Sequence, residues 1–243
     1  MKQIVLLVCA MFIGDEAAAQ GTSKMFVAIN GAYQLTVGDF SNGATRRENA
    51  EDGRLDATYV VKGGPAIDVA GGALVWRNLG VGVGVTRFAV NTPTTLTGSV
   101  PHPFFFNRLR PVSGEASGLS REEFAFHVHA RGVFPVTPRI QVMVFGGPSF
   151  FRVNQGVVTD FTYRDSYPYD DATFGSAVTS TPKVSKLGFG GGGDVAFFFS
   201  RQVGVGGTFQ FAGTTVEVAG AGGATQGIKV GGAKAGGGLR LRF

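Results

Sequence analysis

Strict alternation of apolar and polar residues runs to the end of the chain and limits its fold more than any other feature. Counting back from Phe243, one face carries only apolar or small residues, whereas the other carries Arg242, Arg240 and Lys234 among glycines. Successive side chains of a β-strand point to opposite faces of a sheet, so a period of two indicates a strand between two unlike environments.

The same alternation occurs in seven earlier segments, which makes eight predicted strands in all. The connections between them alternate in length, with short turns at 77–78, 135–138 and 200–201 and long loops at 36–64, 91–121, 152–185 and 216–227. This order is typical of a meander that crosses a membrane, with both termini at the end that carries the short turns. The seven segments are 25–35, 65–77, 79–90, 123–134, 139–151, 186–199 and 202–214.

The N-terminus has the features of a secretory signal peptide. Lys2 precedes an apolar run from Ile4 to Gly14, and Ala17-Ala18-Ala19 supplies the small residues that signal peptidase requires. We therefore expect a signal peptide at 1–19, cleavage after Ala19, and one barrel domain at 20–243. An uncleaved interfacial anchor or a lipoprotein modified at Cys9 is the alternative. Cys9 is the only cysteine, so the mature chain has no thiol for a disulfide or a metal.

Composition excludes some other classes. No apolar stretch reaches the 18 residues of a transmembrane helix, and glycine, with 39 residues, interrupts the apolar segments. The net charge of +5 comes from scattered basic residues without a run, so we expect no nucleic-acid partner.

Two eight-stranded barrels fit this pattern. A soluble, lipocalin-like binder would turn its apolar face inward, and a transmembrane barrel would turn it outward. Abundant glycine on the polar face suits a narrow interior, and the long loops all fall at one end. The sequence therefore predicts an all-β, eight-stranded, antiparallel up-and-down transmembrane β-barrel.

Two short stretches resemble a known family. Leu239-Arg240-Leu241-Arg242-Phe243 resembles the C-terminal signature of bacterial outer-membrane barrels, and Phe145-Gly146-Gly147-Pro148-Ser149-Phe150 is similar to a central strand of the small outer-membrane β-barrel family. The resemblance implies an outer-membrane location, lipid and lipopolysaccharide as surroundings, and insertion machinery that recognises the strand ending in Phe243. It implies no single activity, because members include structural proteins, adhesins and small pores.

Several motifs have a functional and a structural interpretation. Gly188-x-Gly190-x-x-Gly193 matches a dinucleotide fingerprint but precedes a predicted strand instead of the required helix, so we interpret it as a glycine row facing inward. His127-x-His129 near Glu123 and Arg131 could bind zinc, although a hydrogen-bond network in the lumen is the favoured interpretation.

The inferred inner face carries more basic than acidic residues. This predicts either a packed plug of ion pairs or a narrow path that prefers anions. The basic residues are Arg131, Arg139, Lys186, Lys234, Arg240 and Arg242, and the acidic residues are Asp68, Glu123 and Asp194.

Other candidates lie at the predicted outer end. Arg87 interrupts an apolar face where it could meet lipopolysaccharide phosphates or simply reach the interface. The aromatic runs 102–106 and 161–169 could form a contact surface, a collapsed cap or an aromatic girdle. His102 and Ser113 share a loop but have no orienting third residue, so they do not indicate catalysis.

The sequence predicts a monomeric outer-membrane protein with a structural or surface-contact role. We expect it to be non-enzymatic and assign no catalytic, cofactor-binding or metal-binding residue. The alternatives are a narrow channel for small solutes or hydrophobic compounds and, less favoured, a soluble ligand binder.

Overall fold

A computed structural model describes residues 24–35, 38–219 and 225–243. The predicted signal peptide at 1–19, including Cys9, lies outside these residues. The described part of the chain contains no helix that could cross a membrane. It folds into twelve strands: β1 (Met25–Gln34), β2 (Phe40–Glu48), β3 (Glu51–Tyr59), β4 (Gly64–Trp76), β5 (Leu79–Pro101), β6 (Leu109–Pro135), β7 (Ile140–Gln155), β8 (Val157–Asp165), β9 (Ala172–Ser180), β10 (Lys183–Phe198), β11 (Val203–Ala219) and β12 (Thr225–Arg242).

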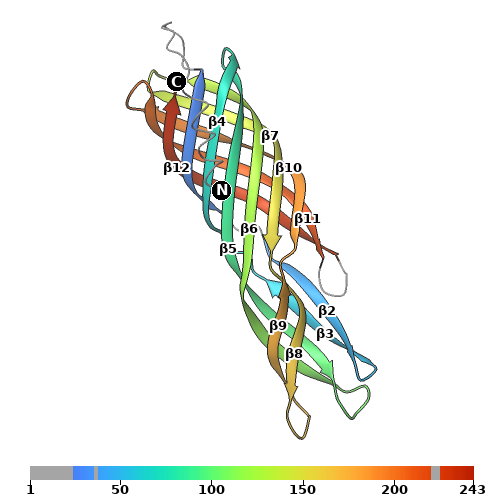
Figure 1. Cartoon of the computed structure of the whole chain (residues 1–243). Coiled ribbons are helices and arrows are strands. Elements are labelled where there is room, and N and C mark those ends of the chain that lie inside the picture. Colours follow the sequence, from blue (N-terminus) through green and yellow to red (C-terminus); the bar gives the residue numbers. More distant parts are fainter. Residues whose placement is uncertain (1–23, 36–37, 220–224) are drawn as a thin grey trace, which may run out of the picture.

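Eight of these strands form a closed antiparallel barrel in the order β1-β4-β5-β6-β7-β10-β11-β12 (Figure 1). The ring closes where β12 pairs with β1, so that Leu239 lies opposite Ile29. Beyond the last paired residues, the backbones of Met25 and Phe243 exchange two hydrogen bonds of 3.1 and 2.9 Å. The barrel is therefore an up-and-down barrel whose first and last strands are neighbours, as the alternation predicted.

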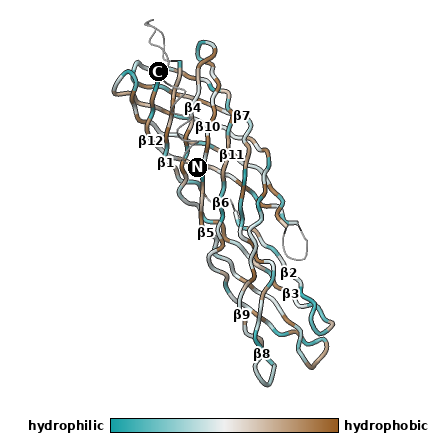
Figure 2. Tube along the Cα trace, in the orientation of Figure 1, coloured by the Kyte–Doolittle hydropathy of each residue, from teal (hydrophilic) through white to brown (hydrophobic). Residues whose placement is uncertain are grey.

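The apolar face of the barrel points outward. Ile67 is 63% exposed, whereas its neighbour Asp68 is 7% exposed, and the same contrast repeats around the wall. Figure 2 shows the resulting alternation of apolar and polar residues along the barrel strands. An outer face of this kind requires an apolar surrounding, so the fold is that of a transmembrane barrel and not that of a soluble lipocalin-like barrel.

The three short turns lie where the alternation placed them, between β4 and β5, β6 and β7, and β10 and β11. The C-terminus lies at the same end of the barrel (Figure 1), which is called the turn end below.

The prediction of long loops at the opposite end was wrong for much of their length. Residues 36–64 hold the hairpin β2–β3, residues 152–185 hold β8–β9, and β5 and β6 run on through most of 91–121. In the fourth predicted loop, at 216–227, β11 continues to Ala219 and β12 begins at Thr225. Backbone pairing therefore continues far beyond the apolar band.

The first three of these continuations form one body, called the projection, at the end opposite the turns (Figure 1). It consists of β2, β3, β8, β9 and the parts of β5 and β6 beyond Thr92 and Leu119. The strands β2, β3, β5 and β6 form consecutive sheet neighbours, and β8 and β9 form a separate two-stranded sheet.

A β-bulge marks the base of the projection. Thr92 pairs with Leu119 and Thr94 with Ala116, so β6 contains one residue more than β5 between these pairs. Gly118 has a φ of +78°, which glycine adopts at little cost. The bulge moves the inner face of β6 from odd to even positions, and inward packing therefore continues into the projection.

The projection has its own apolar core, which is continuous with apolar side chains in the adjoining half of the barrel. Within it, the rings of Phe40 and Tyr59 stack with centroids 4.3 Å apart. The Tyr59 hydroxyl accepts a 2.7 Å hydrogen bond from the Val158 amide and thereby joins β8 to the β2–β3 hairpin. Burial raises the pKa of Tyr59, although the hydrogen bonds from Val158 and Asn42 partly oppose this shift.

Candidate functional site

A continuous chain of hydrogen bonds crosses the barrel interior. It includes a side chain from every barrel strand except β11, so the network ties nearly the whole circumference together. Buried polar groups need such partners because desolvation without them is costly. In order, the chain joins Asp194, Arg240, Asn30, Asp68, Thr86, His127 and Ser149.

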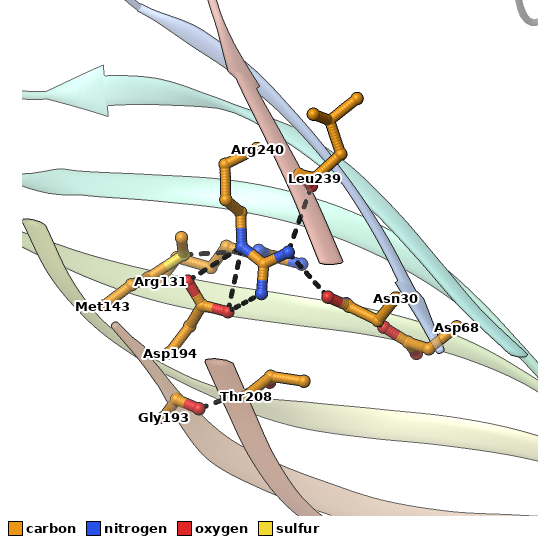
Figure 3. Close-up of polar contacts among 9 residues, drawn as sticks. All are labelled: Asn30, Asp68, Arg131, Met143, Gly193, Asp194, Thr208, Leu239 and Arg240. Atoms are coloured by element: carbon orange, nitrogen blue, oxygen red, sulfur yellow. Dashed lines mark hydrogen bonds and ion pairs between the residues drawn. The ribbon is translucent and has the colours of Figure 1, made fainter. Parts of the chain in front are cut away.

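Arg240 is the branch point of this network (Figure 3). Its Nε donates to both carboxylate oxygens of Asp194 at 3.1 Å, and its second terminal nitrogen forms a further short contact with the same carboxylate. The other terminal nitrogen donates to Asn30 Oδ1 at 2.6 Å. A buried, multiply bonded ion pair of this kind fixes geometry more than an exposed pair does.

Thr86 determines the protonation of its neighbour His127. The Thr86 hydroxyl donates its one proton to Asp68 Oδ2 at 2.9 Å and accepts from Lys234 Nζ. The 3.1 Å contact between Thr86 Oγ1 and His127 Nε2 is therefore a hydrogen bond in which Nε2 carries the proton. In this tautomer His127 Nδ1 accepts from Ser149 Oγ at 2.7 Å, so both ring nitrogens have a partner within the network.

A second polar cluster lies closer to the projection and surrounds Glu123. This carboxylate accepts from Arg121 Nε at 2.6 Å, from the Gly231 amide at 2.9 Å and from Gln34 Nε2 at 3.3 Å. Gly231 has a φ of +85°, and a Cβ there would overlap the backbone of Ala212, so the position requires glycine. Arg121 also donates to the Lys229 carbonyl at 2.5 Å.

The predicted set of six basic residues inside the barrel was wrong for three of them, although a smaller basic excess remains. Arg139 lies exposed in a turn, Lys186 is exposed near one end of its strand, and Arg242 is half-buried at the turn end. Arg242 donates there to the Arg201 carbonyl at 2.7 Å, outside the lumen. Among described residues, the lumen holds four basic and three acidic side chains: Arg121, Arg131, Lys234 and Arg240, against Asp68, Glu123 and Asp194.

The residues of the zinc hypothesis do not come together. The rings of His127 and His129 stack with centroids 5.3 Å apart, but Glu123 belongs to the separate cluster around Arg121. In the described ranges, the structure brings no three His, Cys, Asp or Glu side chains into a metal-binding group. Arg131 also lies beside His129, where its charge would oppose a cation.

Apolar side chains fill the interior between the polar network and the projection. Phe151, Val216 and Ile228 point inward from three strands and belong to the same cluster as the projection core. Two cavities in the interior measure about 20 and 10 Å³, each enough for roughly one water molecule. In the described residues the lumen is therefore packed and is not a water-filled path.

Two of the three glycines in the β10 motif have the inward position that the pattern predicted. Gly188 and Gly190 share the inner face with Asp194, whereas Gly193 lies on the outer face, where the prediction was wrong. Gly188 and the neighbouring Gly192 face the interior, where a Cβ would lie 3.0 Å from the rings of Phe151 and Phe145 respectively. No helix follows the motif, because β10 continues to Phe198. The row of glycines thus provides room for large side chains on β7.

The aromatic runs fall into two groups with different environments. Phe161 is fully buried and Tyr163 is half-buried, so both belong to the projection core. Three phenylalanines at the β5–β6 turn and Tyr167 at the β8–β9 turn are instead strongly exposed, with Phe104 at 69% and Tyr167 at 88%. We call Phe104, Phe105, Phe106 and Tyr167 the aromatic tip.

Arg110 joins the two turns that carry the aromatic tip. It is 1% exposed, and its Nη1 donates to Asp165 Oδ1 at 2.6 Å and to the Tyr169 carbonyl at 3.3 Å. Its Nη2 donates to the Pro101 carbonyl at 2.8 Å. The ring of Phe104 then lies edge-on to Tyr169, with centroids 5.1 Å apart. The exposed rings are therefore mounted on an ordered base.

The pair His102 and Ser113 does not form a catalytic arrangement. His102 is buried in the β5–β6 turn, where its Nδ1 accepts from the amides of Phe104 and Phe105 at 3.1 and 3.2 Å. Ser113 is exposed on β6, and no hydrogen bond joins it to His102 in the described residues. His102 thus shapes the turn that presents the aromatic tip.

Sequence reasoning missed two central residues, Arg110 and Arg121. Arg121 lies two residues before Glu123 and therefore on the same, inward face of the strand. A predicted strand that began at residue 121 instead of 123 would have included it. Arg110 lies beyond the bulge at Gly118, so its inward position does not follow from the alternation of the barrel segment. Arg87 is exposed as expected and lies 3.4 Å from Glu122.

Comparisons with known proteins support the fold. No family model matches the chain, and no curated protein matches its sequence. The solved outer membrane protein OprG from Pseudomonas aeruginosa is similar in structure, with a TM-score of 0.53, 8% identity, and coverage of 91% of this chain and 96% of that one. Neisserial surface protein A gives a TM-score of 0.43 at 12% identity, with coverage of 92% and 100%. The chain thus has the fold of small eight-stranded outer-membrane β-barrel proteins.

Proposed function

We propose that this protein is an integral outer-membrane barrel that holds a non-enzymatic contact surface, the aromatic tip, away from the cell. In this proposal the signal peptide directs the chain out of the cytoplasm, the turn end faces the periplasm and the projection faces outward. The sealed interior supports a mechanical role for the barrel, and the exposed rings support a contact role for the projection.

The observation that carries the proposal is the clamp made by Arg110. Four exposed aromatic side chains would ordinarily collapse on one another or on the core, because contiguous exposed apolar surface is unfavourable in water. Here a buried guanidinium binds both turns at their bases, and neither Phe104 nor Tyr167 belongs to the projection core. Aromatic side chains on a rigid base lose little conformational entropy on binding, so they suit a contact surface.

A narrow channel is the second candidate. The apolar packing around Phe151, Val216 and Ile228 argues against it, because an ion would have to displace side chains that are almost fully buried. Planar-bilayer recording of the refolded protein separates the two roles. We expect no discrete conductance. Stable unitary currents would instead favour the channel over a barrel with a packed interior.

Lipid and lipopolysaccharide are the proposed surroundings of the wall. Arg87 lies opposite Phe124, which in turn lies opposite Arg152 on β7, so two exposed guanidinium groups flank an apolar ring. Arginine is well suited to phosphate groups at this interface. We further propose that the protein is a monomer and that insertion machinery recognises the terminal strand ending in Phe243.

Attachment of whole cells tests the contact role. We expect cells that display a variant with Phe104, Phe105 and Phe106 replaced by serine to attach to other cells or surfaces much less than wild-type cells. Val178→Ser removes an exposed apolar side chain elsewhere on the projection and is the matched control. Both variants should retain heat-modifiable migration of a folded barrel. Equal attachment by all three proteins would remove the aromatic tip as the contact surface.

A further inference from the structure

Arg131 is the one charged side chain among the described lumen residues that has no ion-pair partner. It is 6% exposed, and no carboxylate lies within ion-pair distance of it. Its guanidinium lies between the rings of Phe26 and Phe145, at 4.5 and 5.3 Å from their centroids, and Nη1 contacts Met143 Sδ at 3.3 Å. These contacts accommodate the flat group but do not neutralise its charge.

The nearby carboxylates are already used by other side chains. Asp194 binds Arg240, and Asp68 accepts from Asn30 and Thr86 and lies 3.8 Å from Lys234. Glu123 pairs with Arg121 in the other cluster. With four basic and three acidic side chains in the described lumen, the positive charge left over resides on Arg131. An uncompensated charge in a packed interior is strongly unfavourable.

Several polar atoms without a protein partner belong to side chains that line a single cavity beside this charge. They are Arg131 Nε, Gln210 Nε2 and both ring nitrogens of His129. His129 and Gln210 are each 3% exposed, so bulk water does not satisfy them. Arg131 and Gln210 contribute donors, and a neutral imidazole contributes one more. The cavity measures about 20 Å³, which is enough for one water molecule or one small ion.

We propose that this cavity is a binding site for one small monovalent anion of the halide class, such as chloride. The anion accepts hydrogen bonds from Arg131, Gln210 and His129 and balances the leftover charge of the lumen. A water molecule would satisfy the same donors without balancing the charge. Gly82 contributes to the site, because a Cβ at this position would overlap the Arg131 guanidinium.

Halide-dependent stability of the refolded full-length barrel provides the first test. At constant ionic strength, sodium gluconate is replaced stepwise by sodium chloride or sodium bromide, and unfolding by urea is measured. Compared with halide-free solution, halide at a hundred times its dissociation constant multiplies the ratio of folded to unfolded protein about a hundredfold. We expect this continuing rise with the logarithm of the halide concentration in the wild type and its loss in Arg131→Met. Arg87→Met changes an exposed arginine and should leave the dependence unchanged.

The stability of Arg131→Met in gluconate separates an anion site from a merely structural arginine. With its charge removed, the variant should be at least as stable in gluconate as the wild type, because no halide is then available to balance Arg131. If Arg131→Met is instead equally destabilised in every salt, the arginine acts through packing and the proposal fails.

A crystal of the wild type grown in bromide gives a test that needs no variant. We expect an anomalous-scattering peak among Arg131, His129 and Gln210. Absence of the peak, together with stability that does not depend on the halide, would mean that the cavity holds water only and would overturn the proposal.

Discussion

Asp194 and Arg240 form an ion pair across a strand that contributes nothing to their bond. Asp194 lies on β10 and Arg240 on β12, with β11 between them. Arg240 reaches its partner by passing over Gly206 of β11, where a Cβ would lie 2.9 Å from the Arg240 Nε. The glycine therefore permits a link between second-neighbour strands that backbone pairing alone does not make.

Breaking this pair should destabilise the barrel strongly. Asp194→Ala leaves the Arg240 charge buried without its carboxylate, and removal of one partner of a buried pair costs about 3–5 kcal/mol. Urea unfolding in lipid vesicles, followed by fluorescence of the single tryptophan, Trp76, measures the loss. The control Glu122→Gln removes the exposed partner of Arg87 and should cost at most about 1 kcal/mol. Equal losses of unfolding free energy in the two variants would show that the buried ion pair stabilises the barrel no more than the exposed one.

The docking of the β8–β9 hairpin should depend on the size of residue 114. A Cβ at Gly114 would overlap the ring of Phe174, so Gly114→Val should weaken docking by about 1–3 kcal/mol. We expect faster cleavage by trypsin after Arg164, at least about fivefold, with an unchanged midpoint of barrel unfolding. The double variant Gly114→Val with Phe174→Ala should recover slow cleavage. Gly227→Ala, which has only an ordinary contact at 3.4 Å, is the control.

Alkaline pH should loosen the projection through Tyr163. Burial, followed by the hydrogen bond and charge of Glu48, raises the pKa of Tyr163 to about 12 from its usual 10.0. The folded state therefore keeps the phenol proton where the unfolded state loses it, so this stabilisation is complete below pH 10 and is lost as the pH rises towards 12. Absorbance of phenolate should show two tyrosines, Tyr59 and Tyr163, titrating later than the others, and Tyr163→Phe should remove one of these two steps. If both steps persist in this variant, Tyr163 does not titrate late.

Replacing Phe243 should affect assembly in the cell more than folding itself. Its side chain is exposed on the wall, and its backbone bonds to Met25 do not require the ring. We expect Phe243→Ala to refold into synthetic membranes nearly as well as the wild type but to accumulate in the outer membrane severalfold less. Phe189→Ala removes an equally outward ring from the middle of the chain. A similar deficit in both variants would point to lost lipid contact instead of lost recognition of the terminal strand.

The sequence predicts the barrel wall well because each wall strand separates two unlike environments. Val81 and Val83 face outward and Gly82 inward, and no long-range information is needed to read that contrast. The turns follow as the points where alternation stops. Residues at the ends of the barrel are harder to place from sequence. Arg139 and Lys186 continue the inward spacing of their strands, but they lie where the wall no longer encloses them and are exposed.

The alternation predicts loops where the projection lies, because the inward residues there include threonine, serine and glycine and contrast little with their outward neighbours. Thr92, Thr94 and Leu96 are all buried, although two of them are polar. The pairing of β3 with β5 joins residues about forty positions apart, which local patterns do not encode. The bulge at Gly118 then reverses the inner face of β6, so Arg110 could not be placed with the aromatic tip from sequence alone.

The interior hydrogen-bond chain also makes the order of chain synthesis matter. Its cations Arg240 and Lys234 are both on β12, the last strand to be made, whereas Asp68 and Asp194 lie on earlier strands. Until β12 meets β1, these carboxylates have no positive partner from that strand and must stay hydrated. An incomplete barrel therefore keeps a wet interior and cannot settle into a stable closed form. Pairing of β12 with β1 therefore closes the ring of strands and at the same time brings Arg240 and Lys234 to the carboxylates of the lumen.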